Sequence, residues 1–503
     1  MKKNLMKICV LSILTFASCS KDDTATSEQE VTIPENQRRP LSAQEVRSKV
    51  FSFVNQGKQF NWGMATSQEL WSAVQNGNKL CTIGFGNNKN DFDRAKTSNQ
   101  VYLQNQLLET IARYEGKTVD KILLSSDNYL NQVNVYIEKQ ETIVALSRLG
   151  YVRYIEPADF RLQEESAIQG KDSSSSSGCG LESEAVSSAD YTVISPNAKA
   201  PWAFYKHNIP AAWGYSSGQG ITLGVVDTGA STVNSLLNGS FNNGASSGRT
   251  VQKYGVYVDS IWPWSTGYDG ANDKCGHGTS MSSVAASPRN DKGQPVGVAY
   301  NCNLITYRAA SNVVLDGYHE LEGVKTAFTS LGNNSSVKVI SMSMGNIISS
   351  GKIEDGIRYA YSKGKLIFCA AGTSTSFTNF AGVIFPAWMA ETVAVTGIKE
   401  AGTYQACDVC HTGSKVEFTI MMQRDGTGNK LPVNSYYDGQ GDYVGGSSVA
   451  TATTAGIATL IWAKNPTWTR DQVLNKLRQT SHLYNNKHPE FGYGMPDALK
   501  AVQ

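Results

Sequence analysis

The sequence carries almost no net charge, and beyond its N-terminal segment it has no long apolar run. Its 503 residues contain 45 Lys and Arg against 43 Asp and Glu, a formal net charge of +2. That balance gives no electrostatic reason to expect nucleic acid or an anionic membrane surface as a partner. After residue 20, no apolar run is long enough to cross a bilayer. The length itself predicts more than one domain.

Cysteine is sparse, and its spacing argues against a zinc site. Only Cys407 and Cys410 stand close together, no second pair accompanies them, and His411 alone cannot complete a tetrahedral site. We therefore predict no metal centre and interpret Cys407 and Cys410 as a local disulfide, with a metal knuckle as the alternative. The pairing of the others cannot be read from the sequence: Cys81, Cys179, Cys275, Cys302 and Cys369.

Residues 1–18 have the pattern of a bacterial export signal. Three lysines precede an apolar run over 8–17, and Ala17-Ser18-Cys19 follows. Small residues directly before a cysteine resemble a lipoprotein processing site, so we expect lipidation at Cys19 and a place in the outer membrane or on the cell surface. The alternative is a simple secretory signal with Cys19 merely nearby.

The next part of the chain predicts a small α+β domain between two polar segments. Residues 19–78 are interpreted as a tether and N-terminal extension with helical periodicity near 46–54 and 70–74. Over 79–160, strands at 79–85, 121–124, 133–137 and 151–155 alternate with helices at 101–114 and 141–150. This is a βαββαβ, ferredoxin-like order. Residues 161–195, with five successive serines at 173–177, form a polar linker.

Residues 196–503 predict a three-layer α/β domain, in which helices cover both faces of a parallel sheet. Apolar strand runs at 221–226, 304–308, 337–342, 365–370 and 391–397 alternate with helical patterns. The helical patterns lie at 278–286, 317–331, 353–363, 448–463 and 469–481. The segment 228–276 shows no period, and we predict surface loops there that shape specificity.

Three polar residues stand in settings that suit chemistry. Asp227 ends an apolar strand and precedes Thr228-Gly229, which places a carboxylate at the carboxyl edge of the sheet. His277 lies between two glycines at the start of a helix of small residues. Ser448 follows Gly445-Gly446-Ser447 in the first turn of a buried helix, where backbone N–H groups are unpaired. Each motif alone is weak, but Asp, His and Ser in this order form a strong combination.

These motifs resemble those of the subtilisin-like serine proteases, over roughly Pro201 to the C-terminus. The blocks are Asp227-Thr228-Gly229, Gly276-His277-Gly278-Thr279 and Gly446-Ser447-Ser448-Val449-Ala450. The resemblance implies a serine endopeptidase in which Ser448 is the nucleophile, His277 the base and Asp227 its partner. It also implies a substrate-binding strand at Ser343, Met344 and Gly345, a specificity-pocket wall at Ala370, Ala371 and Gly372, and an oxyanion hole that includes the Ser448 backbone N–H.

The chain departs from the family pattern at two positions. Thr373 stands where the family has its oxyanion asparagine, and Ala452 stands where it has a proline. A slow protease, a protease with a donor from elsewhere such as Asn379, and an inactive relative acting as a surface binding protein all remain open. The intact triad favours activity.

The resemblance extends to the segment before the catalytic domain. Residues 145–157 are similar to the end of a subtilisin-type propeptide, so the chain is expected to be a zymogen inhibited by its own pro-domain and cleaved between about Phe160 and Tyr191. Protein or peptide substrates are implied, with no cofactor for catalysis; whether structural calcium binds is not readable. Membrane contact is expected only through the lipid.

Overall fold

The structure is a computed structural model that describes residues 31, 33–92, 97–163, 179–374, 382–401 and 403–503. Cys19, the serines at 173–177 and Asn379 lie outside these residues, so the expectations for them are not addressed by the coordinates. Within the described part of the chain, no helix combines the length and the apolar character needed to span a membrane.

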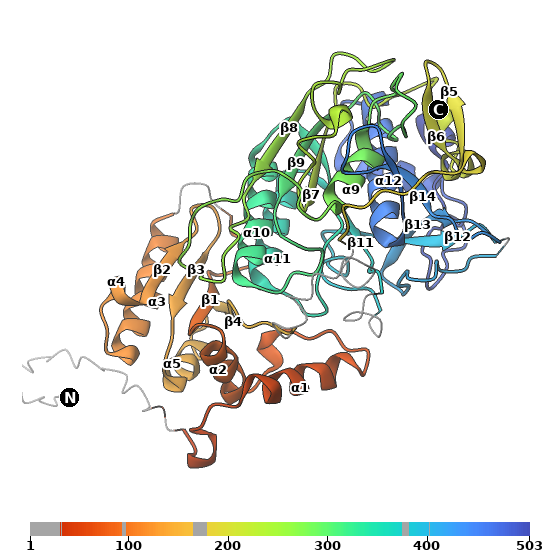
Figure 1. Cartoon of the computed structure of the whole chain (residues 1–503). Helices are drawn as coiled ribbons and strands as arrows, with labels where there is room; N and C mark the ends of the chain where they lie inside the picture. The colour runs from red at the N-terminus through yellow and green to blue at the C-terminus, as the bar shows by residue number, and fades with distance from the viewer. Residues whose placement is uncertain (1–30, 32, 93–96, 164–178, 375–381, 402) are drawn as a thin grey trace, which may run out of the picture. The chain divides into compact units, whose positions relative to one another are not determined.

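Residues 80–157 form a four-stranded antiparallel sheet with helices packed on one face (Figure 1). The strand order is β2-β3-β1-β4, with β1 in the middle. The elements are β1 (Leu80–Phe85), α3 (Ser98–Glu115), α4 (Val119–Ile122), β2 (Leu123–Ser126), β3 (Gln132–Tyr136), α5 (Gln140–Ser147) and β4 (Val152–Pro157). This is the βαββαβ order that the sequence predicts, except that a helical turn occupies 119–122 and the second strand begins later than expected.

Two further helices from the N-terminal extension share the core of this sheet. They are α1 (Ala43–Val54) and α2 (Ser67–Asn76), and each begins with a capping box in which Ser42 or Thr66 caps the backbone. Val46 and Val50 on α1 pack in the same cluster as Ile83 and Phe85 on β1. The described part of the extension therefore folds with the small domain.

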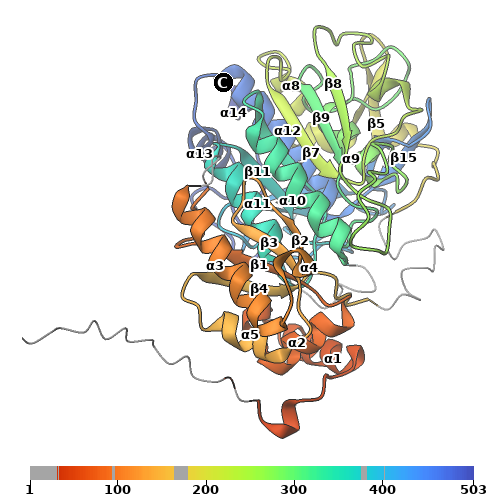
Figure 2. The same cartoon turned by 90° about the vertical axis from the view of Figure 1, so that its left-hand side faces the viewer.

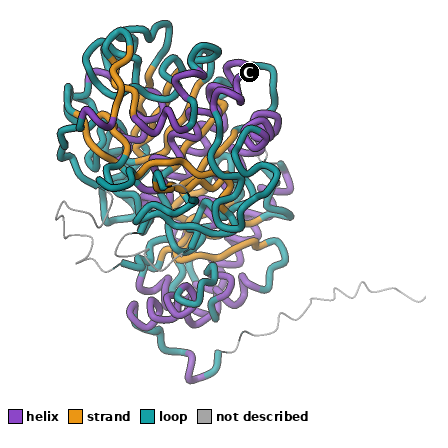
Figure 3. The backbone as a smooth tube through the Cα atoms, turned by 90° about the vertical axis from the view of Figure 1, so that its right-hand side faces the viewer, coloured by secondary structure: helices purple, strands orange, loops and turns teal. Residues whose placement is uncertain are grey.

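The larger part of the chain is built on a seven-stranded sheet in which every pairing is parallel. Its order is β13-β12-β11-β10-β7-β9-β8. The strands are β7 (Thr222–Asp227), β8 (Val251–Gly255), β9 (Asn303–Arg308), β10 (Val337–Met342), β11 (Leu366–Ala370), β12 (Val393–Lys399) and β13 (Val416–Gln423). They are drawn in orange in Figure 3.

In β7 and β11, alternate side chains belong to two different cores, one on each face of this sheet. Val225 on β7 packs in one cluster with α9 (His277–Ala286) and α12 (Gly446–Lys464), whereas its neighbour Val226 packs in the other with α10 (Tyr318–Asn333) and α11 (Gly351–Ser362). This is the period-two alternation of a strand buried on both sides. The expected three-layer α/β architecture is confirmed (Figure 2).

Smaller elements complete the domain. Two antiparallel ribbons pair β5 (Tyr191–Ile194) with β6 (Ala198–Pro201) and β14 (Leu431–Asn434) with β15 (Gly441–Val444). The remaining helices are α7 (Trp202–Lys206), α8 (Ile209–Ala212), α13 (Arg470–Gln479) and α14 (Ala498–Val502).

The prediction that 228–276 contains only loops is wrong in two places, and the smaller of them is a 3-10 helix over Ser235–Leu237. Val251–Gly255 form β8, the edge strand beside β9. Its residues alternate between half-buried and exposed positions, so the strand lacks the continuous apolar run that marks the central strands.

Candidate functional site

Asp227 is the last residue of β7, and β7 lies at the point where the strand order of the sheet reverses. The chain proceeds from β7 outward to β8 and β9 on one side and to β10 and β11 on the other. Crevices form at the carboxyl ends of strands at such a switch point. Asp227 is buried there, and its Oδ1 accepts a hydrogen bond of 2.8 Å from the backbone N–H of Thr228.

His277 is the first residue of α9 and contacts Asp227 directly. Gly276 precedes the helix with φ of +90°, a left-handed conformation that glycine adopts without strain. His277 Nδ1 lies 2.7 Å from Asp227 Oδ1. A proton on Nδ1 satisfies this bond and leaves Nε2 with a lone pair, which is the tautomer that a general base needs.

The surroundings of His277 favour its protonated form. Burial lowers the pKa of the imidazole, but the charge and hydrogen bond of Asp227 outweigh burial, and the Asp273 carboxylate acts in the same direction. The net result is a pKa of His277 above its ordinary value. An imidazolium formed during a reaction is therefore stabilised at this position.

Ser448 lies in the first turn of α12, which packs against α9. Gly446 begins the helix with φ of +83°, and a Cβ there would come within 2.6 Å of the Thr373 hydroxyl oxygen. The carbonyl oxygen of Ser448 accepts a hydrogen bond of 3.1 Å from Ser343 Oγ. The strand end at Ser343 and the start of α12 are thus tied together.

A carboxylate that the sequence analysis did not single out organises the loop before His277. Asp273 is fully buried, and its Oδ1 accepts hydrogen bonds from Thr228 Oγ1 and from the backbone N–H groups of Cys275 and Gly276. Its Oδ2 accepts from both the N–H and the hydroxyl of Thr279, at 2.8 and 2.7 Å. One buried acid therefore links the residue after Asp227 to both sides of His277.

The hydroxyl of Thr373 is engaged with the helix that carries Ser448. Its Oγ1 accepts the backbone N–H of Ser447 at 3.1 Å and lies 3.0 Å from Ser447 Oγ. Ser447 Oγ also accepts the N–H of Gly372 at 3.1 Å. Thr373 therefore lies beside the start of α12, where the resemblance expects an oxyanion donor, and it holds that helix in place.

The residues predicted to bind substrate line the ends of β10 and β11. Ser343, Met344 and Ala370 are buried. Gly345 already pairs with a neighbouring segment, since its N–H donates to Val313 and its carbonyl accepts from Leu315. A peptide added at Gly345 would have to displace these bonds, which the sequence prediction did not foresee.

The wall formed by Ala371 and Gly372 is backed by His411. The N–H of His411 donates to the Gly372 carbonyl, and a Cβ on Gly372 would overlap the His411 ring. Burial lowers the pKa of His411. Its neutral ring acts as packing behind the predicted pocket wall.

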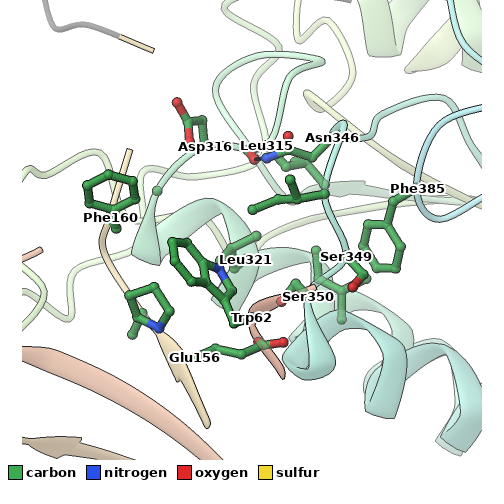
Figure 4. Close-up of a pocket in the computed structure, with 15 residues that line it drawn as sticks. Trp62, Glu156, Phe160, Leu315, Asp316, Leu321, Asn346, Ser349, Ser350 and Phe385 are labelled. Carbon is green, nitrogen blue, oxygen red and sulfur yellow. Dashed lines mark hydrogen bonds between the residues drawn. The ribbon is translucent and has the colours of Figure 1, made fainter. Parts of the chain in front are cut away.

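The chain that follows β4 reaches the same edge of the larger sheet. The backbone N–H groups of Leu162 and Gln163 donate to the two oxygens of Asp316, at 2.8 and 2.7 Å. Burial raises the pKa of Asp316 to about 7. Phe160 and Trp62 lie edge to face, 5.8 Å apart, and line a cavity of about 30 Å³ with Leu321 (Figure 4).

The small domain also contacts the starts of α10 and α11. Arg153 makes a two-pronged ion pair with the fully buried carboxylate of Asp355. Glu156 accepts the N–H of Gly351 at 2.7 Å, and Asp159 accepts the N–H of Tyr318 at 3.1 Å. Carboxyl oxygens at helix N-termini satisfy N–H groups that have no partner within the helix.

Two disulfides are present in the described residues. Cys407–Cys410 is the expected local pair, and it leaves the metal-knuckle alternative without its ligands. Cys179–Cys275 joins two residues that are 96 positions apart and places a cross-link two residues before His277. The sequence analysis left this pairing open. Among the described residues, no group of three or more His, Cys, Asp or Glu could hold a metal ion.

More than half of the chain is similar to known serine peptidases. Residues 218–495 match the model described as "Subtilase family". Subtilisin from Bacillus sp. (strain TA39) is 26% identical over 309 residues, covering 58% of this chain and 68% of the relative. Alkaline elastase YaB from Bacillus sp. (strain YaB) is 26% identical over 304 residues, covering 60% and 70%.

Two solved structures share the fold over most of the chain. Fervidolysin from Fervidobacterium pennivorans has a TM-score of 0.57 at 17% identity, covering 84% of this chain and 61% of that one. A mutant of the epidermin leader peptide processing serine protease from Staphylococcus aureus has a TM-score of 0.54 at 17% identity, covering 84% and 99%. At 17% sequence identity, these two similarities are evidence for the fold and not for a shared activity.

Proposed function

This chain belongs to the subtilase family of serine peptidases, and from that membership we propose that it is an exported endopeptidase made as a self-processing zymogen. It acts through Asp227, His277 and Ser448 and an acyl-enzyme. The observation that carries the proposal is the 2.7 Å contact between His277 Nδ1 and Asp227 Oδ1, with Ser448 in the first turn of the adjacent helix.

In the proposed reaction, Ser448 Oγ attacks the carbonyl carbon of a peptide bond while His277 Nε2 takes its proton. The C–N bond then breaks, and the imidazolium gives that proton to the departing amine. Water repeats the sequence on the acyl-enzyme and releases the acid. Asp227 holds the ring in place and stabilises its charged form, consistent with the raised pKa of His277.

The oxyanion that forms during attack needs hydrogen-bond donors. The backbone N–H of Ser448 lies in the first turn of α12, where it has no partner within the helix. Thr373 supplies no amide, and its hydroxyl is bonded to Ser447. We therefore propose an oxyanion hole with fewer donors, and a slower enzyme than relatives with the asparagine.

The hydrogen bonds between the Thr373 hydroxyl and Ser447 also support a second candidate function. A catalytically weak or inactive subtilase would serve as a surface binding protein that keeps the protease scaffold without turnover. The contact between Asp227 and His277 favours the enzyme, because a pure binding protein has no chemical need for it.

The pro-region is proposed to inhibit the enzyme in the same molecule. Arg153, Glu156 and Asp159 hold the small domain on α10 and α11, and the following residues bond to Asp316 beside the predicted substrate strand. A tail held at that edge competes with substrate. Its removal requires cleavage in the linker, which the enzyme itself is proposed to perform.

Export and anchoring complete the proposal. The signal over 1–18 and Cys19 direct the precursor to the bacterial outer membrane or cell surface, and cleavage in the linker would free the catalytic domain from the lipid. The mature domain would then enter the periplasm or the exterior. A mature domain that stays with membranes after high-salt and carbonate washing would contradict this.

A labelled fluorophosphonate distinguishes the two candidates. The enzyme reacts at Ser448, and Ser448→Ala abolishes both labelling and conversion of the precursor to the smaller form. If the matured protein stays unlabelled, the binding-protein candidate is correct. If purified Ser448→Ala matures as fast as the parent, self-processing is wrong.

A further inference from the structure

Part of the segment predicted to be a polar linker is fastened beside His277. We call Cys179–Ser187 the strap. Cys179 forms a disulfide with Cys275, and the N–H of Gly180 donates to the Cys275 carbonyl at 2.8 Å. A Cβ on Gly276 would overlap the carbonyl oxygen of Gly180 and lie 3.3 Å from Leu181 Cδ2. The strap therefore lies directly on the loop that carries His277.

The other end of the strap is fastened to the ribbon that leads into Ser448. The N–H of Glu184 donates to the Gly441 carbonyl at 3.2 Å, and Ser183 Oγ bonds to Gln440. The N–H of Ser187 donates to Tyr443 Oη at 2.9 Å. Because β15 ends at Val444, the strap connects the surroundings of the base with those of the nucleophile.

Asp190, three residues after the strap, anchors its C-terminal end. Asp190 is buried, pairs with Arg424, and accepts hydrogen bonds from Asn429 and Tyr443. Because one end is held covalently and the other by an ion pair, the path of the residues between them is fixed. The strap is thus a built part of the larger domain.

The strap contacts elements other than those predicted to hold the acyl part of the substrate. The pro-region tail bonds to Asp316, and the adjacent Leu315 bonds to Gly345 of the predicted substrate strand. The strap instead contacts Gly276 and Gly441. If a peptide runs from the substrate strand across Ser448 to the His277 loop, the residues after its scissile bond meet the strap.

We propose that the strap is a permanent wall of the cleft on the leaving-group side, and that Leu181 selects the residues that follow the scissile bond. This inference rests on the proposed endopeptidase function. The disulfide keeps the strap in place after any cut on the N-terminal side of Cys179. The partner is a peptide segment of apolar character, since Leu181 is the apolar side chain placed against the His277 loop.

Two substrates with the same apolar residue before the scissile bond test the role of Leu181. One is a peptide p-nitroanilide, which has no amino acids after the bond, and the other is an internally quenched peptide with several. In the matured enzyme, Leu181→Ala should lower the ratio of kcat/KM for the quenched peptide to that for the p-nitroanilide about tenfold, as expected for one lost apolar contact. Val193→Ala, an exposed position on β5, should leave this ratio unchanged.

The possible outcomes separate the two proposals. Hydrolysis of the p-nitroanilide with an unchanged ratio in Leu181→Ala overturns the strap's role and leaves the endopeptidase standing. Equal losses on both substrates indicate a merely structural role and also overturn it. A parent protein that hydrolyses neither substrate contradicts the proposed function, and with it the selection by Leu181.

Retention of the strap is tested by mass. Under non-reducing and reducing conditions alike, the matured chain should begin at or before Cys179 and include the strap. A mature chain that begins anywhere after Cys179, with or without a disulfide-linked peptide, overturns the permanent wall. The paired variant Cys179→Ser with Cys275→Ser should shift the substrate ratio in the same direction as Leu181→Ala; if it fails to fold, the alanine variant still decides.

Discussion

Arg153 and Asp355, 202 residues apart in the chain, form a two-pronged ion pair with N–O distances of 2.8 and 2.7 Å. The Asp355 side chain is fully buried, and Tyr154 Oη donates to it at 3.0 Å. Losing one partner of a buried ion pair costs about 3–5 kcal/mol, and Arg358, 3.8 Å from Asp355, leaves that carboxylate only a longer ionic contact. Arg153→Ala should therefore destabilise the precursor by about that amount and shorten the lag before p-nitroanilide hydrolysis begins.

Denaturant unfolding of the precursor in a Ser448→Ala background measures the first effect, and the time course of the active protein measures the second. Arg148→Ala, at an exposed position of the same domain, is the matched control. Equal stability of the two variants would show that the ion pair contributes nothing to holding the small domain on the larger one.

Asp273 is predicted to act on catalysis through His277. Asp273→Asn removes a charge that raises the pKa of His277, so that pKa should fall. Because the reaction needs the neutral imidazole, the acid limb of the kcat/KM profile should move to lower pH. The amide cannot accept every hydrogen bond that the two carboxylate oxygens receive, so kcat should also fall about tenfold or more at the plateau.

The pH–rate profile of the variant distinguishes positioning from a general loss of structure. Partial unfolding lowers the plateau without moving the limb, and that result would exclude an electrostatic role for Asp273. Asp259→Asn, a change at an exposed acid outside these hydrogen bonds, should reproduce the parent profile.

Thr373 is the position at which activity should be easiest to raise. Thr373→Asn places an amide beside Ser448 and should increase kcat by up to about 100-fold, a size known from the loss of a single oxyanion donor in subtilisin. Thr373→Ser keeps the hydroxyl that accepts from Ser447 and should stay close to the parent. A fall in kcat for the asparagine variant would mean that the bond to Ser447 matters more than the missing donor.

Glu156 should make the stability of the precursor depend on pH. Burial raises its pKa to about 8 from an ordinary 4.5, with Glu354 and Asp355 adding to the rise and Gly351 and Lys352 opposing it. The folded chain then holds a proton that the unfolded chain gives up. Stability associated with Glu156 is therefore fully present below about pH 4.5 and is lost as pH rises toward about 8.

Melting temperatures at about pH 5, 6.5 and 8, which span this range, test the dependence in the Ser448→Ala background. Glu156→Gln cannot ionise, so its melting temperature should rise relative to the parent as pH increases. Glu109→Gln, an exposed acid on α3, should keep a constant difference. A constant difference for Glu156→Gln as well would place its pKa near the ordinary value.

Much of the architecture could be predicted from the sequence because central parallel strands are apolar throughout. β7, β10 and β11 begin and end within a residue of the predicted bounds. The edge strand β8 was missed since it is half exposed, and β13 was not anticipated although Val416–Met422 are mostly apolar. The apolar pattern in the sequence identifies a strand less clearly where its residues are not all buried.

The site residues also divide into those that a local motif predicts and those that only the fold brings together. Asp227, His277 and Ser448 stand in recognisable local motifs, whereas Asp273 sits in Asn272-Asp273-Lys274, which has the composition of an ordinary polar turn. Its partners Thr228 and Thr279 lie 45 positions before and 6 after it, and only the fold brings them together. The Cys179–Cys275 pair is likewise a long-range contact, and no spacing rule identifies it.

The burial of α12 has a consequence for how this protein should fail on heating. Residues 446–462 are buried along the helix, which packs against β10, β11, β12 and β13 of the central sheet. Ser448 therefore cannot shift without disrupting the centre of the domain. Thermal inactivation should coincide with the cooperative melting of the entire larger domain, rather than precede it through gradual loosening of the residues around Ser448.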